Sequence, residues 1–340
     1  MNPEGFGVEV TSMRDQKKIF WRVVILLPLW LLFFAPLGAF GQDFPTKPIT
    51  IYCGQSAGAT TDLTARAIAE GVQEELGVPV VVEDKAGGGQ TVAATLLASK
   101  KGDGYTLGAI GSSALDIRHM ILKLAYDPFK DFTYIIAYGE YPGGLCVKAD
   151  SPFKTLADLV EHARKNPGAL SYSSSGTGAP HQIAIEYLAQ QAEVKFKHVP
   201  FAGGAPACTV LIGGHVDFTA GAGIHLNYLK QGIFRMLAVT TSTKREPKFP
   251  DVPTLKDLGY KMVPSGGEYL ILAPKGVPAP VLKKLELAFR KVAYSRKFRE
   301  RLENLDVPFA FKDRHQLETE APQNYQFWGE LMKELGLLRK

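Results

Sequence analysis

The chain has 340 residues, of which 46% are hydrophobic and 21% are charged, and its net charge is +5. This length is enough for two domains with separate hydrophobic cores. The positive charge is small and is not gathered into a basic stripe with interleaved aromatic residues, so the composition argues against nucleic acid as a partner.

The N-terminus has the pattern of a secretory signal. A basic segment over residues 14–22 precedes an apolar run over residues 23–40, which ends in small residues. We therefore predict that residues 1–41 are a signal peptide, cleaved before Gln42, and that Met13 is the true start. An uncleaved anchor helix is the alternative, because the apolar run approaches the length of a membrane span. With cleavage, the mature chain is expected in the periplasm.

The cysteine count limits the covalent chemistry of the exported chain. Its three cysteines, Cys53, Cys146 and Cys208, all have apolar neighbours. An odd number cannot pair completely within one chain, so buried free thiols are favoured over one disulfide plus a free cysteine. No set of Cys and His has zinc spacing, so neither a metal nor a cofactor is expected.

Strand and helix patterns alternate along the mature chain. An apolar run over residues 49–52 predicts a strand, and after a loop of small residues a helix is expected to open near residues 60–62. Strands are also expected over residues 78–82 and 105–110, with a helix over 91–99 between them. This order is typical of a doubly wound sheet.

A second round of strands and helices begins after residue 144. Thr155 and Asp158 predict a capping box for a helix that ends near Asn166. One long amphipathic helix is expected to carry Leu282 through Phe298, and a last helix to cover residues 317–337. The further strands are expected over residues 145–148, 170–173, 196–199, 216–219, 235–240 and 268–273.

The last two helices need a sheet to cover, which predicts how the chain is divided. Because the first round supplies only three strands, the chain is expected to return to that sheet near residue 268. We predict an α/β fold of two lobes, each a doubly wound and mostly parallel sheet, with a hinge and a central cleft. Domain 1 is expected to comprise residues 42–143 and 268–340, and domain 2 residues 144–267.

Four loops share one design, in which a strand end is followed by small residues and then by a helix start. They are residues 54–62, 111–113, 174–181 and 201–207. In open parallel sheets, ligands bind beyond the carboxyl ends of the strands, and helix N-termini favour negative charge. These loops therefore predict a site for a carboxylate or a phosphate. The absence of a P-loop or dinucleotide motif disfavours nucleotides.

The first of these loops also spells the esterase motif G-x-S-x-G, with Gly54, Ser56 and Gly58. A secreted serine esterase using Ser56 is therefore an alternative. However, the nucleophile elbow normally follows several earlier strands, whereas this loop follows the first strand of the mature chain. No histidine is set beside an evident acidic partner, which also weighs against this alternative.

Several polar and aromatic residues near the loops have two interpretations. His181, in the first turn of its helix, could donate to a ligand carboxylate or face solvent. Asp62 could stabilise its helix N-terminus, contact the ligand, or do both. Phe201 and Tyr269 could line a pocket or pack in the core, and Arg118 is expected to be solvated.

The order and spacing of ten short stretches resemble one family, the Bug-type solute receptors of tripartite tricarboxylate transporters. The resemblance covers essentially residues 44–310. The stretches are FPTKPITI from residue 44, PVVVEDKAGGG at 79–89, GYTL at 104–107, YDPFKDF at 126–132, SYSSSGTGAPH at 171–181, HVPFAGGAPA at 198–207, GGHVDF at 213–218, LAVT at 237–240, FPDVPTLKDLG at 249–259 and LAPKGVPAP at 272–280.

The resemblance implies a non-enzymatic periplasmic binding protein with a type II-like, two-lobed fold. Such a receptor is a monomer that closes on one small carboxylate and delivers it to the large and small membrane subunits of a permease. With the loop argument, the predicted ligand-binding residues are Ser56, Ala57, Gly58, Ala59, Asp62, Ser112, Ser113, Ser174, Ser175, Gly176, Thr177, Gly178, His181, Phe201, Gly203, Ala205 and Gly221.

The sequence departs from the family pattern at two places where ligand identity is decided. The first loop usually carries an aromatic residue and paired glycines, but here Ala59 replaces the second glycine. After Asp217 the family usually has an acidic or amide residue that faces the site. In this chain, residues 219–223 read TAGAG and are all small. The ligand therefore stays open among dicarboxylates, tricarboxylates, aromatic carboxylates and amino acids. A receptor that signals to a membrane kinase is a further alternative.

Overall fold

The computed structural model describes residues 44–201, 203–241, 245–246, 248–261, 263 and 267–338. The predicted signal peptide over residues 1–41, its cleavage before Gln42 and the start at Met13 lie outside these ranges. Within them, every helix is too short or too polar to cross a membrane.

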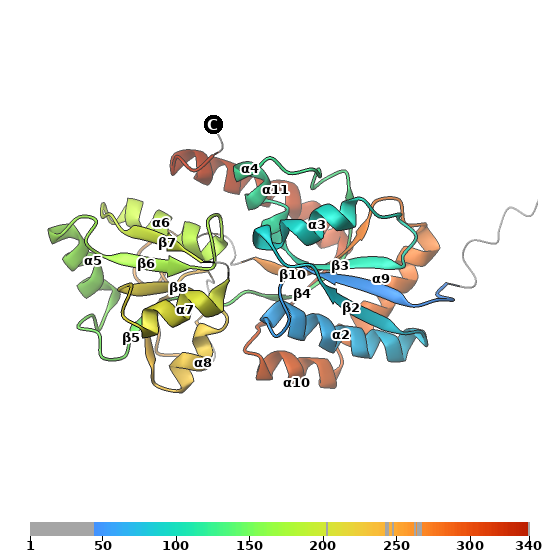
Figure 1. Cartoon of the computed structure of the whole chain (residues 1–340), viewed down its shortest axis with the longest axis horizontal. Coiled ribbons are helices and arrows are strands. Elements are labelled where there is room, and N and C mark those ends of the chain that lie inside the picture. The colour runs from blue at the N-terminus through green and yellow to red at the C-terminus, as the bar shows by residue number, and fades with distance from the viewer. Residues whose placement is uncertain are drawn as a thin grey trace, which may run out of the picture. The chain divides into compact units, whose positions relative to one another are not determined.

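The first sheet has six strands in the order β11-β4-β10-β3-β1-β2 (Figure 1). The central strand β1 pairs in parallel with β2 and β3, whereas β10 runs antiparallel to β3 and β4, and β11 antiparallel to β4. Only β10 and β11 therefore run against the other strands. The bounds are β1 Ile49–Cys53, β2 Val80–Asp84, β3 Thr106–Gly111, β4 Phe132–Glu140, β10 Glu268–Pro274 and β11 Phe309–Asp313.

The second sheet has five strands in the order β7-β6-β8-β5-β9. The strand β5 is antiparallel to both neighbours, and the other pairs are parallel. Each sheet is thus mixed with most strands pointing one way, and the predicted two-lobed α/β fold is confirmed. The bounds are β5 Gly143–Lys148, β6 Ser171–Ser174, β7 Lys197–Pro200, β8 Phe218–Ala222 and β9 Phe234–Val239. We call each sheet with its helices a lobe.

Helices cover both sheets. The first lobe contains α2 (Thr60–Leu76), α3 (Thr91–Ala98), α4 (Ile117–Ile121), α9 (Ala279–Ala293), α10 (Arg296–Asn304) and α11 (Arg314–Glu334). The second lobe contains α5 (Leu156–Lys165), α6 (Pro180–Gln191), α7 (Gly204–Ile212) and α8 (His225–Lys230). The predicted capping box of α5 is confirmed: Asp158 N donates to Thr155 Oγ1 at 3.2 Å, and Thr155 N donates to Asp158 Oδ2 at 2.9 Å.

The prediction of one long helix through Phe298 is wrong. The chain forms α9 and α10, which are separated at Tyr294 and Ser295. Phe298 N donates to Ser295 Oγ at 3.2 Å, so this serine caps the second helix. The strands β4 and β11 were not predicted from the sequence. Every residue of β11 is partly exposed at the sheet edge, so the strand carries no alternating hydrophobic pattern.

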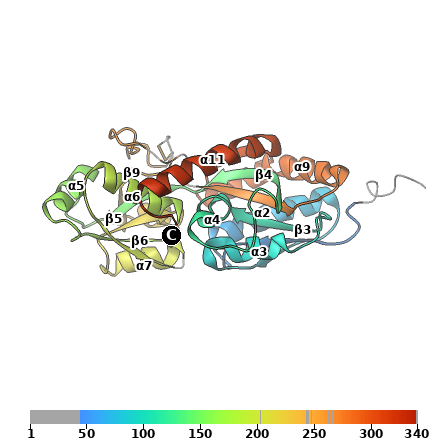
Figure 2. The same cartoon turned by 90° about the horizontal axis from the view of Figure 1, so that it is seen from above.

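The last helix, α11, contacts both lobes. It packs on β4 of the first sheet, and its Trp328, Leu331 and Met332 join a core cluster with Ile183 and Ala184 of α6. Figure 2 shows α11 running from the side of β4 toward α6. The C-terminal helix therefore buries apolar surface from both lobes, although it belongs in sequence to the first.

All three cysteines are free and buried, as expected. Burial raises the pKa of the Cys53 and Cys208 thiols to about 12. Burial likewise raises the pKa of Cys146 well above its ordinary value. Because the thiolate is the reactive form, these residues are unreactive packing groups.

Candidate functional site

Three loops of the predicted site lead directly into helices. Among the described residues, no side chain caps the first turn of α2, α6 or α7, whose N-cap residues are Ala59, Ala179 and Gly203. Side chains of Thr155, Ser295 and Asp313 cap α5, α10 and α11, whereas, in the same part of the chain, α3, α8 and α9 also have no side-chain cap. What α2, α6 and α7 share is that each follows one of the small-residue loops. An uncapped helix N-terminus leaves backbone N–H groups for an anion.

Asp62 positions the first loop. Gly58 N donates to Asp62 Oδ2 at 2.8 Å, and Arg66 Nε lies 2.6 Å from Asp62 Oδ1. The Asp62 side chain is buried, whereas Ser56, Ala57 and Gly58 are exposed. Both carboxylate oxygens are thus engaged within the protein. Asp62 holds the loop in shape while Ser56 stays accessible to a ligand.

Gln90 joins the first loop to two neighbours. Gly111 N donates to Gln90 Oε1 at 2.8 Å, and Gln90 Nε2 donates to the Tyr141 hydroxyl at 3.2 Å. A Cβ added to Gly54 would lie 2.7 Å from Gln90 Cβ. One buried side chain therefore ties together loops that follow β1, β2 and β3. This role of Gln90 was not predicted; the signal in the sequence is its place directly after three glycines.

The loop after β6 satisfies its own polar groups. Ser174 is buried, and its hydroxyl lies 2.7 Å from His198 Nε2. Gly178 N donates to Gln182 Oε1 at 3.0 Å, and Phe201 N donates to Ser174 O at 3.0 Å. The loop over residues 174–178 is therefore held by hydrogen bonds to its own and neighbouring residues, and it lies beside Phe201. Its Thr177 is exposed and its Ser175 is half-buried.

Loops of the second lobe lie against the first. A Cβ added to Gly178 would lie 2.5 Å from Ile121 Cδ1 of α4. A Cβ added to Gly223 would lie 3.6 Å from Thr60 Oγ1, at the start of α2. Glycine at position 178 thus lets the backbone of the second lobe approach α4 closely, whereas a Cβ at Gly223 would make an ordinary contact with Thr60.

Two histidines, His181 and His225, are buried beside the start of β5, where the chain passes from the first lobe to the second. His181 Nδ1, both ring nitrogens of His225 and the hydroxyls of Thr240 and Thr241 have no hydrogen-bond partner among the described residues. Burial lowers the pKa of His181 to about 4. Burial, followed by the charge of His181, lowers the pKa of His225 to about 3. Both rings are therefore neutral at pH 7 and carry unused hydrogen-bonding capacity.

The remaining predicted residues are dispersed over several environments. Glu268 N donates to Ser112 Oγ at 3.1 Å, Ser113 and Gly203 are half-buried, and Ala205 is exposed. Gly221 is buried against the ring of His225, so its side of the sheet is closed. Tyr269 is buried and stacks on Tyr141 with ring centroids 3.9 Å apart, which makes it a packing residue.

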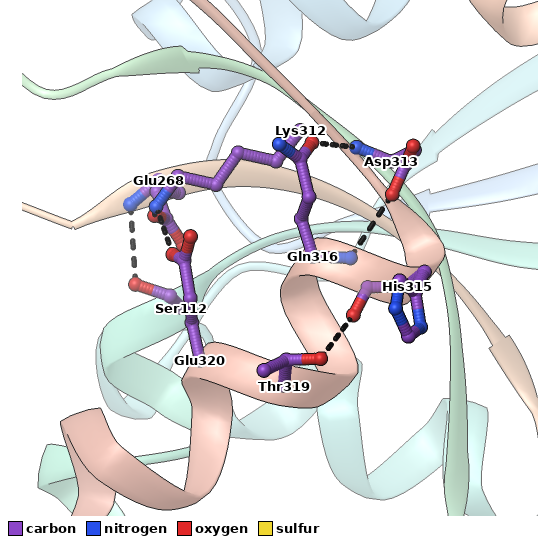
Figure 3. A network of polar contacts seen from close by, with 8 residues as sticks. All are labelled: Ser112, Glu268, Lys312, Asp313, His315, Gln316, Thr319 and Glu320. Atoms are coloured by element: carbon purple, nitrogen blue, oxygen red, sulfur yellow. Dashed lines mark hydrogen bonds and ion pairs between the residues drawn. The ribbon is translucent and has the colours of Figure 1, made fainter.

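A pocket with about 400 Å³ of empty volume is lined by Ser112, a predicted ligand residue, but by no residue of α2, α6 or α7. Asp116, Glu268 and Glu320 are among its lining residues, so it is acidic and poorly suited to a carboxylate. Lys312 Nζ lies 2.5 Å from both Glu268 Oε1 and Glu320 Oε2, as Figure 3 shows. Burial, followed by the charge of Glu268, raises the pKa of Asp116 to about 7.

One group of side chains has the composition of a metal site. Ligand atoms of Cys53, Asp62 and Asp84 lie within 4.8 Å of one another. Arg66 already bridges the two carboxylates, at 2.6 Å from Asp62 and 3.1 Å from Asp84. The guanidinium supplies the positive charge that a cation would bring, so this group is a structural ion-pair network.

The chain is similar to proteins of one family over most of its length. The pattern of the "Tripartite tricarboxylate transporter family receptor" matches residues 64–337. The "UPF0065 protein in gbd 5'region" of Cupriavidus necator is 34% identical over 304 residues, which cover 89% of this chain and 92% of that protein.

Solved structures agree with this similarity. Periplasmic binding protein BugD aligns with a TM-score of 0.79 and 29% identity, over 87% of this chain and 100% of that one. A protein of R. palustris determined with adipate aligns with a TM-score of 0.79 and 26% identity, over 88% of this chain and 100% of that one.

Proposed function

Because the chain belongs to the receptor family of tripartite tricarboxylate transporters, we propose that its two lobes close on one small carboxylate in the periplasm. The protein is a carboxylate-binding receptor for a transporter. The observation that supports the binding site is the set of uncapped N-termini at α2, α6 and α7. Backbone amides at these ends are suited to a ligand carboxylate.

The proposed lobes are residues 42–143 with 268–340, and residues 144–267. In this arrangement Ser56 and the backbone of residues 57–59 contact the carboxylate from the first lobe. Residues 174–178 contact it from the second, with Phe201 and Gly203 as a wall. Asp62 acts as a positioning residue, because its carboxylate is engaged by Gly58 and Arg66.

The proposed route of the ligand follows from the family. The exported monomer, freed of residues 1–41, carries its ligand to the large and small membrane subunits of a permease. BugD is named as a periplasmic binding protein, and we propose that this chain likewise has no enzymatic activity. The Ser56 hydroxyl has no histidine within hydrogen-bond distance among the described residues, which disfavours the esterase alternative.

A thermal-shift screen over carboxylates tests the proposal. A ligand at 100 times its Kd should stabilise the fold by about 2.7 kcal/mol. Esters of the same acids are assayed in parallel with wild type and Ser56→Ala. Ester turnover that disappears in Ser56→Ala, without stabilisation by any carboxylate, would establish the esterase instead.

A matched pair of glycine variants locates the site. Gly176 has φ +126°, and a Cβ there would lie 3.3 Å from Phe201 O. Gly176→Val should abolish the thermal shift caused by the ligand. Gly214 also has positive φ, at +71°, but a Cβ there would meet no atom within 4 Å, so Gly214→Val should keep the shift although it also strains the backbone. Equal ligand shifts in the two variants would exclude the loop over residues 174–178 from the site.

A further inference from the structure

Arg118 lies between glycine-rich segments of the two lobes. A Cβ added to Gly89 would lie 2.5 Å from both Arg118 Nε and Nη1, so the guanidinium lies directly on the backbone of this turn in the first lobe. A Cβ added to Gly176 of the second lobe would lie 3.5 Å from Arg118 Nη2. A side chain at position 89 would displace the guanidinium from this position.

This guanidinium has no anionic partner among the described residues. Its Nε is buried and makes no hydrogen bond. Nη1 and Nη2 also make no hydrogen bond with the described residues, yet they are not fully enclosed, so they keep contact with solvent. Burial lowers the pKa of Arg118, although arginine stays charged at any physiological pH. A partly buried cation without a counter-ion is costly, which points to an anion that comes from outside the chain.

The neighbouring polar groups do not fill this role. Asp116 is close in sequence, but its Oδ1 accepts from Ile117 N at 2.8 Å. The neutral Tyr126 hydroxyl donates to Ala114 O at 2.5 Å. Asp116 and Tyr126 thus each already make a hydrogen bond with a backbone atom, and neither makes one with Arg118.

The position of Arg118 relates it to the proposed carboxylate site. Gly54, at the start of the first loop, packs on Gln90, whereas Arg118 packs on the adjacent Gly89. Consecutive Cα atoms are only about 3.8 Å apart, so the first loop and the guanidinium flank one short turn. A short ligand with a negative charge at each end would suit both features.

We propose that Arg118 binds a second carboxylate of the ligand and makes this receptor selective for short dicarboxylates. This inference rests on the proposed function and specifies its substrate class. A guanidinium can bind a carboxylate through two parallel hydrogen bonds, which distinguishes it from backbone amides or a lysine. A monocarboxylate of equal length would leave the guanidinium without its partner.

Calorimetric titration with matched acids tests the proposal. Adipate is compared with hexanoate, and succinate with butanoate, so that each pair differs by one carboxylate. Wild type should bind the preferred dicarboxylate at least about 30-fold more tightly than its matched monocarboxylate, and higher salt should reduce this ratio. Arg118→Gln should bring the ratio of the two Kd values close to one, because the dicarboxylate binds more weakly. The Kd of the monocarboxylate should stay unchanged within about threefold. Arg118→Lys, which keeps the charge without the fork, should be intermediate.

Two controls separate binding from folding and from long-range charge. Lys123→Gln removes an exposed cation from the same segment and should leave the ratio unchanged. Ligand-free Arg118→Gln should melt no lower than wild type, because it loses an unpaired charge and no hydrogen bond. Equal weakening of both acids, or a ratio unaltered in Arg118→Gln, would overturn the proposal.

The outcomes also separate this inference from the proposed function. Tight binding of monocarboxylates with no preference for dicarboxylates would overturn the role of Arg118 and leave the carboxylate receptor intact. Failure of every carboxylate to bind wild type would overturn both.

Discussion

Gly143 and His181 are in contact at the point where the chain passes from the first lobe to the second. A Cβ on Gly143 would lie 2.6 Å from His181 Nδ1 and still closer to Thr241 Oγ1. His181 was predicted as a ligand residue, but its ring lies against the start of β5. Ligand contact by His181 stays a prediction, while its packing on Gly143 is a property of the described fold.

This contact predicts that Gly143→Ala destabilises the protein. Thr241 and His181 are both buried, so they cannot move without disturbing their neighbours, and overpacking of this kind costs about 1–3 kcal/mol. Urea unfolding measures the effect. Gly329→Ala is the control. Gly329 lies inside α11, and a Cβ there would contact only Met120 of α4, at an ordinary distance of 3.7 Å. That change should stabilise the helix by about 0.5–1 kcal/mol. Equal effects of the two substitutions would refute the argument.

The buried histidines predict a loss of stability in acid. Burial lowers the folded-state pKa of His181 to about 4 and that of His225 to about 3, from the ordinary 6.5. The unfolded chain therefore binds more protons below pH 6.5, and each histidine removes about 1.4 kcal/mol of stability per pH unit as pH falls from 6.5 toward its folded pKa. Unfolding free energies between pH 7 and pH 5 measure this slope.

Variants are needed to assign the slope, because Asp116 acts in the opposite direction. Its pKa is raised to about 7, so its contribution to stability declines as pH rises. The pH slope of stability should decrease in His181→Gln and in His225→Gln. His162→Gln, which removes an exposed imidazole, should keep the wild-type slope. Parallel pH profiles for all three variants would show that the two buried rings do not titrate as expected.

Asp62 predicts a coupled loss of loop order and ligand affinity. Asp62→Asn removes the ion pair with Arg66 and weakens the bond from Gly58 N, so we expect a stability loss of about 1–3 kcal/mol. Ligand affinity should fall as well, because the loop over residues 56–59 is no longer held. Asp150→Asn is the matched control, since its pair with Lys148 spans 3.6 Å at an exposed site, and it should change stability by less than about 0.5 kcal/mol.

The cysteines predict a simple chemical result. All three thiols are buried and free, and burial raises the pKa of each. A thiol reagent should therefore find almost no reactive group in the native protein and three in urea. Detection of only one thiol in urea, without reductant, would reveal a disulfide that contradicts the described state.

Local sequence patterns predicted elements that depend on nearby residues. The capping box of Thr155 and Asp158 forms as expected, and the β1–loop–α2 unit follows its apolar run and small-residue loop. The break between α9 and α10 was missed because Leu282 through Phe298 keep helical spacing across Ser295. The partly exposed edge strand β11 gave no periodic signal, since its place is fixed by pairing with β4.

The sequence alone determined the family, the alternation of strands and helices, and the small-residue loops, because these properties reside in short segments. The tertiary structure decided which side chains hold those loops together and which charged groups lie beside them. Gln90 links two of the loops to its own loop, and Asp62 serves the loop that it follows. Arg118 lies between Gly89 and Gly176 with no anionic partner among the described residues. These relationships connect residues that are distant in the chain, and burial rather than residue type determines their hydrogen-bonding and charge states.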